Sequence, residues 1–257
     1  MTASADGKQQ TTAPATATQL KHVFVVGFPR SGTTWMMWLL AKLPGVVALQ
    51  QSGMFHALRD VEAWWKTNHN YSKQEGATEA APEFDGTETL LAPAEYYDLL
   101  RPFCERVHQR VAAASPGTQI VVEQTPENLE FQETIRSFFP DAYFLNVIRD
   151  PRDACVSMLR AAKSWDNELP GRPIHVANRW NEYMRRAKIL RQRTSNYTEV
   201  RYEDLKRMGV EEMRRIAEWL GIEVTDALIR EAFPCIGQTA SCRPVDHTFP
   251  MRYTYLS

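Results

Sequence analysis

The sequence predicts an α/β fold, a single domain with a central parallel sheet flanked by helices. Short β-branched runs alternate with longer segments of helical spacing, and this alternation produces a parallel sheet covered on both faces. The chain has 257 residues, enough for one large domain with a substantial core. Residues 1–20 are rich in Thr, Ala, Gln and Ser and lack apolar periodicity. We therefore expect a disordered leader at 1–20 and the folded domain at 21–257.

Each element of this fold follows from a local pattern. The predicted strands are the apolar or β-branched runs at 22–26, 119–122, 142–148 and 198–201. The predicted helices have apolar residues at helical spacing and lie at 33–43, 94–114, 129–138, 151–162, 174–194 and 211–220. Pro44-Gly45 ends the first helix, Gly221 ends the last, and Pro151 lies in the first turn of its helix. Residues 51–92 fit no long period, so we interpret them as short helices and loops that form a lid.

Composition excludes several classes of function. Apolar residues make up 44% of the chain and the formal net charge is −1, which argues against a nucleic-acid binder held by bulk positive charge. The cysteines form no C-x-x-C pair and so indicate neither a zinc cage nor a disulfide framework. No apolar run approaches the roughly 20 residues of a membrane span, and the N-terminus lacks the apolar core of a signal peptide. We therefore expect a cytoplasmic protein.

A P-loop-like strand, loop and helix follow one another at 22–43. In this order the backbone N–H groups of the loop and the helix dipole converge on one spot that favours an anion. The loop at 27–34, GFPRSGTT, has the G-x-x-x-x-G frame of nucleotide-triphosphate loops. Thr33 stands where that motif needs lysine, and the cation is instead Arg30. The loop therefore suits a nucleotide with a single 5′-phosphate-type group.

Two other interpretations of this loop remain open. A small-molecule kinase with a degenerate loop would bind ATP with magnesium, although no obvious aspartate for the metal ends a later strand. A nucleotide-binding regulatory module would keep the phosphate cradle without any chemistry.

A second candidate anion site lies where the strand at 142–148 ends. Arg149 follows this strand, and Ser157 comes eight residues later in the predicted helix. The two side chains can grip one phosphate if the chain folds back at Asp150-Pro151.

The segment 28–35, FPRSGTTW, resembles the 5′-phosphosulfate loop of sulfotransferases that use 3′-phosphoadenosine 5′-phosphosulfate (PAPS) and release 3′-phosphoadenosine 5′-phosphate (PAP). The resemblance implies that Arg30 contacts the bridging and leaving oxygens and that Trp35 stacks near the adenine. It implies that the residues holding the 5′-phosphate are Ser31, Gly32, Thr33 and Thr34. Sulfuryl transfer depends on positioning and preorganised donors, so we expect that no metal is required.

Two further segments carry the same resemblance, which covers residues 22–222. Arg149 and Ser157 resemble the family's 3′-phosphate pair, and the segment 200–205, VRYEDL, resembles its stretch near the adenine, with Tyr202 as the contact. The chain lacks the late Arg-Lys-Gly loop that completes the 3′-phosphate site in cytosolic animal members. Either other basic residues replace it, with Arg243 and Arg252 as candidates, or the site is more open.

An acceptor hydroxyl needs a proton acceptor, and the sequence offers two. Glu123 is the first choice, because it follows the strand at 119–122, at the edge where α/β sheets bind their ligands. His56 is the second, because an imidazole titrates near neutral pH and other branches of the family carry their base after the first helix. The expected acceptor is a small molecule with a hydroxyl, with an amine as second choice. Aromatic residues in 55–97 favour an apolar or aromatic alcohol. The sequence leaves the oligomeric state open.

Overall fold

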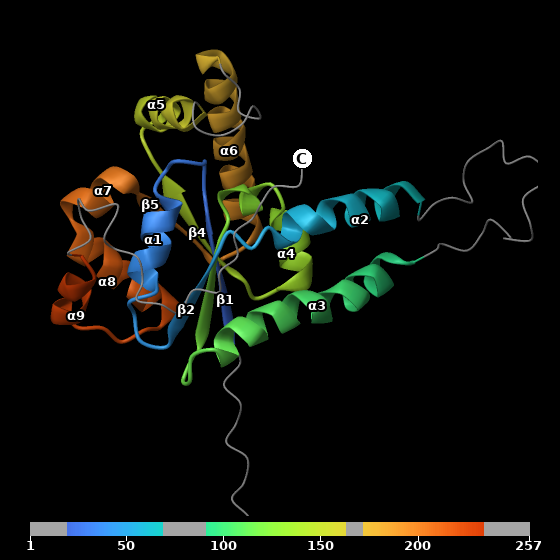
Figure 1. Cartoon of the computed structure of the whole chain (residues 1–257), viewed down its shortest axis with the longest axis horizontal. Coiled ribbons are helices and arrows are strands. Elements are labelled where there is room, and N and C mark those ends of the chain that lie inside the picture. The colour runs from blue at the N-terminus through green and yellow to red at the C-terminus, as the bar shows by residue number, and fades with distance from the viewer. Residues whose placement is uncertain (1–19, 69–90, 163–171, 234–257) are drawn as a thin grey trace, which may run out of the picture.

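Five parallel strands form the centre of the molecule, in the order β2-β3-β1-β4-β5 (Figure 1). The computed structural model describes residues 20–68, 91–162 and 172–233. Its strands are β1 (Lys21–Val26), β2 (Val46–Gln50), β3 (Ile120–Gln124), β4 (Tyr143–Ile148) and β5 (Tyr197–Arg201). The central strand β1 pairs with β3 on one side and β4 on the other, and its apolar run is completely buried from Val23 onward.

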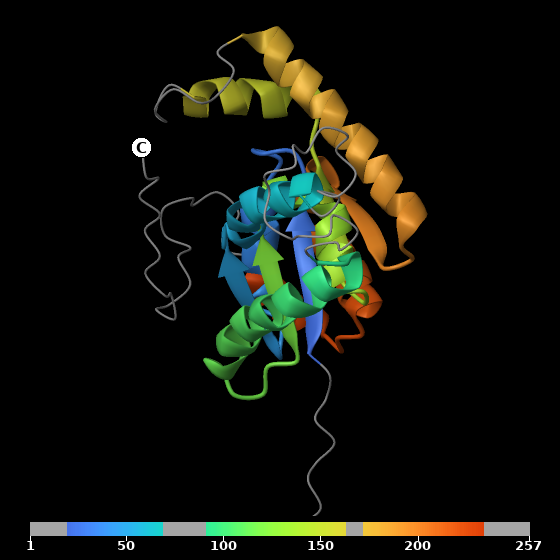
Figure 2. The same ribbon diagram turned by 90° about the vertical axis from the view of Figure 1, so that its right-hand side faces the viewer.

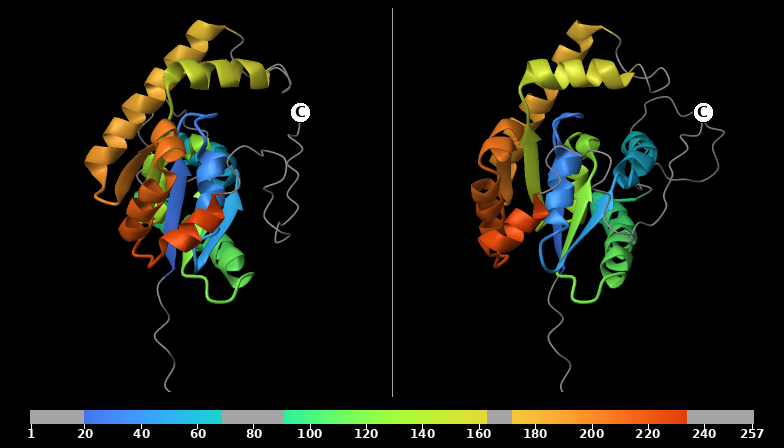
Figure 3. Two further views of the ribbon diagram at one scale, coloured as in Figure 1. Left: turned by 90° about the vertical axis from the view of Figure 1, so that its left-hand side faces the viewer. Right: turned by 60° about the vertical axis from the view of Figure 1, so that its left-hand side comes forward.

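Helices cover both faces of this sheet, so two hydrophobic cores form (Figure 3). One face is packed by α1 (Thr33–Leu40), α7 (Tyr202–Arg207), α8 (Gly209–Leu220) and α9 (Asp226–Ala232). The opposite face is packed by α2 (Met54–Asn68), α3 (Pro93–Ala113), the 3₁₀ helix η2 (Pro126–Leu129), α4 (Gln132–Phe138), α5 (Pro151–Ala162) and α6 (Pro173–Arg193). Figure 2 shows α5 lying beyond the carboxyl ends of the strands. The predicted α/β class with a parallel sheet flanked by helices is confirmed.

The differences from the predicted elements have local causes. The edge strand β2 was not predicted, because four of its five residues are only half-buried, the fifth is exposed, and the strand follows directly on Pro44-Gly45. The helix predicted at 129–138 begins only at Gln132, as α4, since the 3₁₀ turn that starts at Pro126 occupies the chain up to Leu129. Two short helices, α7 and α9, were missed. In the predicted lid, α2 is one continuous helix, and residues 69–90 lie outside the described residues, as does nearly all of the predicted leader.

Gly27, where β1 gives way to the loop, admits no side chain. Its φ is 145°, and a Cβ atom there would lie 2.5 Å from the carbonyl oxygen of Val147. We expect Gly27→Ala to lower the free energy of unfolding by on the order of 3 kcal/mol, from backbone strain and this contact together. Gly117→Ala is the matched control, because Gly117 also has a positive φ but its Cβ would meet nothing within 4 Å. Chemical unfolding tests the pair, and equal losses would contradict the packing argument.

No helix within 20–68, 91–162 and 172–233 is both long enough and apolar enough to cross a membrane.

Candidate nucleotide-binding and catalytic site

The loop between β1 and α1 presents backbone N–H groups at the start of a helix. The N–H of Ser31 donates to the carbonyl of Phe28 at 3.0 Å, which closes a turn, and both Arg30 and Gly32 have positive φ angles. Gly32 is the residue before α1, and no side chain caps the first turn of that helix. The first-turn N–H groups and the positive end of the helix dipole therefore point to one spot that attracts an anion.

The two anion motifs predicted far apart in the sequence meet at this loop. The Arg149 guanidinium donates from Nη1 to the backbone carbonyl of Arg30 at 3.1 Å, across a separation of 119 residues. The Arg30 side chain donates from Nε to the Oγ of Ser157 at 3.4 Å. The carboxyl ends of β1 and β4, together with α5, thus bring two guanidinium groups and a hydroxyl into one cluster.

The turn at Asp150 connects β4 to α5, the helix that carries Ser157. Hydrogen bonds from Arg152 hold the pKa of Asp150 well below its ordinary range. The N–H of Asp150 donates to Glu203 at 2.9 Å, which ties the start of α5 to α7. These bonds fix the turn from which α5, the helix that carries Ser157, begins.

Tyr202 and Trp35 form an aromatic wall beside the loop. Their ring centroids lie 5.5 Å apart at 69°, and the Cζ of Arg149 lies 4.5 Å from the Tyr202 ring centroid. A Cβ atom on Gly32 would come within 2.5 Å of the Tyr202 ring, so only glycine lets this ring pack against the loop. The wall offers flat apolar surface next to the cluster of cations.

Several polar atoms at the loop are buried without a hydrogen-bond partner among the residues that the structure describes. They include Ser31 Oγ, Arg149 Nε and the indole N–H of Trp35. A buried polar atom that lacks a partner costs free energy. The two donors, with the Ser31 hydroxyl, therefore fit a ligand that carries several acceptor oxygens.

Thr33 and Thr34 link the loop to the end of β3. The amide of Gln124 donates to the Oγ of Thr33 at 3.1 Å, and the hydroxyl of Thr34 donates back to Gln124 at 3.4 Å. Gln124 was not predicted as a site residue, although it directly follows Glu123. This pair of bonds sets the first turn of α1 against the strand that carries Glu123.

Glu123 is completely buried, and its carboxylate accepts three hydrogen bonds. One oxygen accepts from the Ser52 hydroxyl and, at 3.1 Å, from the amide of Asn128. The other lies 2.9 Å from Nε2 of His108, a completely buried residue of α3. Behind it, Nδ1 of His108 lies 2.8 Å from Nδ1 of His22 on β1. None of these four residues was predicted as a partner of Glu123 or His108, because they come from four separate segments, namely the loop after β2, η2, α3 and β1.

The partly buried His22 makes the fold sensitive to acid. Burial and the neighbouring His108 lower the pKa of His22 from 6.5 to about 4. The unfolded chain therefore binds a proton below pH 6.5 that the folded chain resists, so stability falls from about pH 6.5 to about pH 4, by about 3 kcal/mol in all. Urea unfolding at pH 7 and pH 5 measures the part of this loss that falls above pH 5, about 2 kcal/mol. His22→Asn should remove most of it, and a wild type equally stable at both pH values would refute the prediction.

His56 lies apart from this network. It is exposed on α2, and its ring meets the edge of Phe131 with centroids 5.0 Å apart. Its charged neighbour is Glu127 of η2, whose pKa is raised by burial. Glu127 was not predicted from the sequence, where it is one of many exposed-looking acids.

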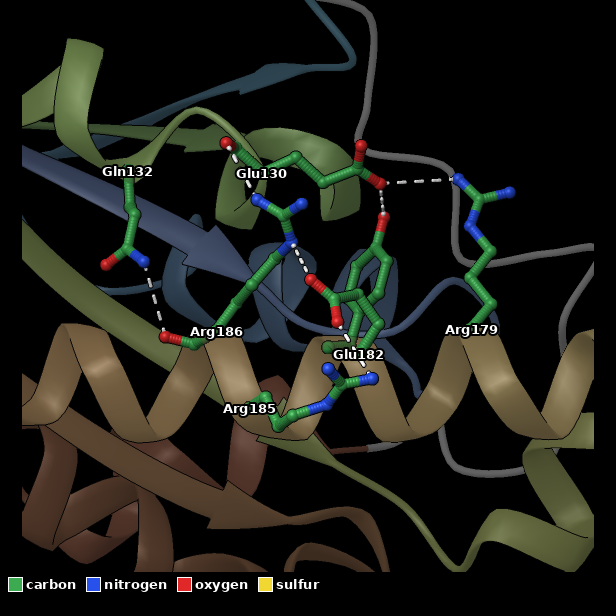
Figure 4. Close-up of polar contacts among 7 residues, drawn as sticks. Glu130, Gln132, Arg179, Glu182, Arg185 and Arg186 are labelled. Atoms are coloured by element: carbon green, nitrogen blue, oxygen red, sulfur yellow. Dashed lines mark hydrogen bonds and ion pairs between the residues drawn. The ribbon is translucent and has the colours of Figure 1, made fainter.

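Figure 4 shows the cluster of charged side chains that fastens α6 next to η2 and α4. The Tyr183 hydroxyl donates to Glu130 at 2.6 Å, and Arg179 lies 3.4 Å from the same carboxylate oxygen. The Tyr183 ring in turn packs edge-on against Phe28 of the loop, with centroids 5.6 Å apart. The cluster therefore supports the loop from the α6 side.

Some predicted features lie beyond the described residues. Arg243 and Arg252, the candidates to complete the 3′-phosphate site, belong to the segment 234–257, as do two of the cysteines. Within the described segments, no group of three His, Cys, Asp or Glu side chains could hold a metal ion.

A parallel sheet with a phosphate-type loop after its central strand, and cations after the neighbouring strand, defines a nucleotide-binding α/β protein. Residues 22–226 match the model of the Sulfotransferase family, and the chain belongs to that family.

One curated relative is the nodulation protein NoeE of Sinorhizobium fredii, which is 26% identical over 136 residues. The match takes in 52% of this chain and 30% of the relative, so the chain spans less than a third of that protein's length.

Solved sulfotransferase structures share the fold. A sulfotransferase of Mycobacterium avium superposes with a TM-score of 0.53 at 17% identity, covering 84% of this chain and 68% of that one. The sulfotransferase domain of the olefin synthase from Synechococcus PCC 7002 gives a TM-score of 0.51 at 18% identity, covering 86% of this chain and 80% of that one.

Proposed function

We propose that this protein transfers a sulfuryl group from PAPS to a hydroxyl of a small acceptor. The observation that carries the proposal is the contact of Arg30 with both Arg149 and Ser157 at the carboxyl edge of the sheet. Two cationic motifs that meet at a helix N-terminus suit a nucleotide with two separate phosphate groups. Membership of the family and the resemblance of the loop point to the same donor.

In this proposal, different residues of the chain bind different parts of the donor PAPS. The loop N–H groups and the hydroxyls of Ser31 and Thr34 hold the 5′-phosphate, and Arg30 stabilises the negative charge that develops on the leaving oxygen. Arg149 and Ser157 hold the 3′-phosphate. When bound, PAPS supplies a sulfuryl group attached to a phosphate that leaves readily, so the residues act by positioning and charge stabilisation.

The adenine takes its place at the aromatic wall. Trp35 and Tyr202 provide ring faces and edges beside the 3′-phosphate pair, at a distance from the loop set by Gly32. Base stacking on aromatic side chains contributes about 1–3 kcal/mol and needs no base-specific hydrogen bonds.

We propose Glu123 as the general base, ahead of His56. A carboxylate has about four lone-pair sites, and the bonds from Ser52, Asn128 and His108 use three of them. Ser52 and Asn128 both donate to one oxygen and use its two lone pairs, so the free lone pair for the acceptor hydroxyl lies on the oxygen that accepts from His108. The His56 ring contacts Phe131, and this placement supports Glu123 rather than His56 as the general base.

The acceptor in this proposal is a small alcohol, with an amine as second choice. Three exposed or half-exposed aromatic residues of α2 and α3, namely Trp64, Tyr97 and Phe103, are consistent with an apolar or aromatic molecule. A panel of phenols, aliphatic alcohols, sugars and amines, assayed with sulfur-labelled PAPS, identifies the class.

A comparison of nucleotides tests the proposal against a kinase and against a binding module. PAP should raise the melting temperature of the protein most, ADP should raise it less, and magnesium should add nothing to ATP. A larger shift with ATP and magnesium than with PAP would favour the kinase. A PAP shift without transfer to any acceptor of the panel would favour the binding module.

A further inference from the structure

We infer that His108 is a positioning residue that orients the Glu123 carboxylate, and that His22 fixes the tautomer in which His108 does so. This inference rests on the proposed function, because it takes Glu123 as the general base. It concerns a row of three titratable side chains, Glu123, His108 and His22. These residues lie on β3, α3 and β1, and the row begins at the carboxyl end of β3.

The His108 ring is fixed by its surroundings. It is completely buried, stacks on Phe139 with centroids 5.0 Å apart at 18°, and packs near Phe24 at 5.8 Å. A ring held in this way has one orientation, so its Nε2 remains directed at the carboxylate and its Nδ1 at His22.

The hydrogen bonds of the row can be assigned a direction. An ionised carboxylate only accepts, so Nε2 of His108 must carry the proton that it donates to Glu123. In a neutral imidazole the other nitrogen then accepts, so Nδ1 of His22 must donate to Nδ1 of His108. The pKa of His22, lowered to about 4, keeps that ring neutral at pH 7. Both hydrogen bonds of the row are therefore donated in the direction of Glu123, from His22 to His108 and from His108 to the carboxylate.

Among the groups that face Glu123, only His108 can orient the carboxylate through Oε2. Cys104, one turn earlier on α3, stays a neutral thiol because burial and the Glu123 charge raise its pKa to about 12. Ser52 and Asn128 are neutral donors that both bond the same oxygen, Oε1. Among the described residues that hydrogen-bond Glu123, His108 is the only titratable one and the only donor to Oε2. Without it, Oε2 would be left buried without a donor and the carboxylate could rotate.

Two substitutions of His108 separate this role from simple packing. His108→Phe keeps a ring between Phe24 and Phe139 but removes the donor. His108→Gln places an amide N–H near the position of Nε2 and so restores the donor without the imidazole. We expect His108→Phe to lower kcat on the order of 10²-fold, with the KM for PAPS and the affinity for PAP unchanged. The acidic limb of its pH–rate profile should also lie at a higher pH than that of the wild type.

His108→Gln is the rescue variant and should recover most of kcat and the wild-type pH profile. Equal kcat in His108→Phe and the wild type would overturn the inference. So would equal losses in both variants together with weakened PAP binding, since that pattern describes a packing role alone.

A measurement independent of activity separates failure of this inference from failure of the proposed function. In protein with ¹⁵N-labelled histidine, NMR should show the proton of His108 on Nε2 and that of His22 on Nδ1, and Glu123→Gln should shift the His108 signals. The opposite tautomers would overturn the inference even in an active enzyme. Correct tautomers in a protein that binds PAP but transfers nothing would instead refute the proposed function.

Discussion

Replacing Arg30 by alanine should lower sulfuryl transfer by on the order of 10²–10³-fold while the protein remains folded. The Arg30 side chain is exposed and lies at the meeting point of the two anion motifs, donating to Ser157 while its own carbonyl accepts from Arg149. The stability of the core therefore does not depend on the Arg30 guanidinium, whereas the proposed stabilisation of the leaving phosphate does. Turnover with labelled PAPS and thermal unfolding measure the two effects separately.

Arg30→Lys is the matched control for this prediction. Arg30 has a φ of 73°, and arginine, lysine and alanine bear a similar cost in that conformation, so the backbone is affected alike in both variants. Lysine keeps the charge but loses the planar fork of donors, and intermediate activity is expected. Near wild-type turnover in Arg30→Ala would show that the loop's cation has no part in the reaction.

Replacing Glu123 by glutamine should have the second large effect, a loss of turnover of about 10²–10⁴-fold with PAP affinity preserved. The amide oxygen can still accept from Ser52 and Asn128. The amide nitrogen would face the N–H of His108, so a loss of stability of about 1–3 kcal/mol is also expected. Steady-state kinetics and PAP titration calorimetry distinguish a lost base from lost binding.

The comparison variant for Glu123 is His56→Ala, which should leave turnover almost unchanged because His56 is exposed and contacts Phe131. If Glu123→Gln turned over normally and His56→Ala did not, the base would be His56.

Much of the fold could be predicted from the sequence because its signals are local. The strands at 22–26 and 142–148 are mostly apolar runs, and Pro151 and Gly221 mark helix ends that the structure retains. The edge strand β2 was missed because an edge position needs less burial and leaves a weaker pattern. Short helices such as α7 are stabilised by tertiary packing rather than by their own sequence.

The site could be predicted only where its residues lie within recognisable segments. Arg30, Arg149, Ser157 and Tyr202 were chosen from separate motifs, and the structure brings their side chains or backbone into contact. The partners of Glu123 carry no such signal. Ser52, Asn128 and His108 come from a loop, a 3₁₀ helix and an α-helix, and only packing around β3 makes them neighbours. His22, which contacts His108, comes from β1.

A crystal structure of the protein with PAP tests the central claim most directly. We predict the 5′-phosphate on the backbone N–H groups of residues 27–34, next to Arg30, and the 3′-phosphate between Arg149 and Ser157, with the adenine against Trp35 and Tyr202. Density for PAP elsewhere, with neither phosphate at these positions, would contradict the account.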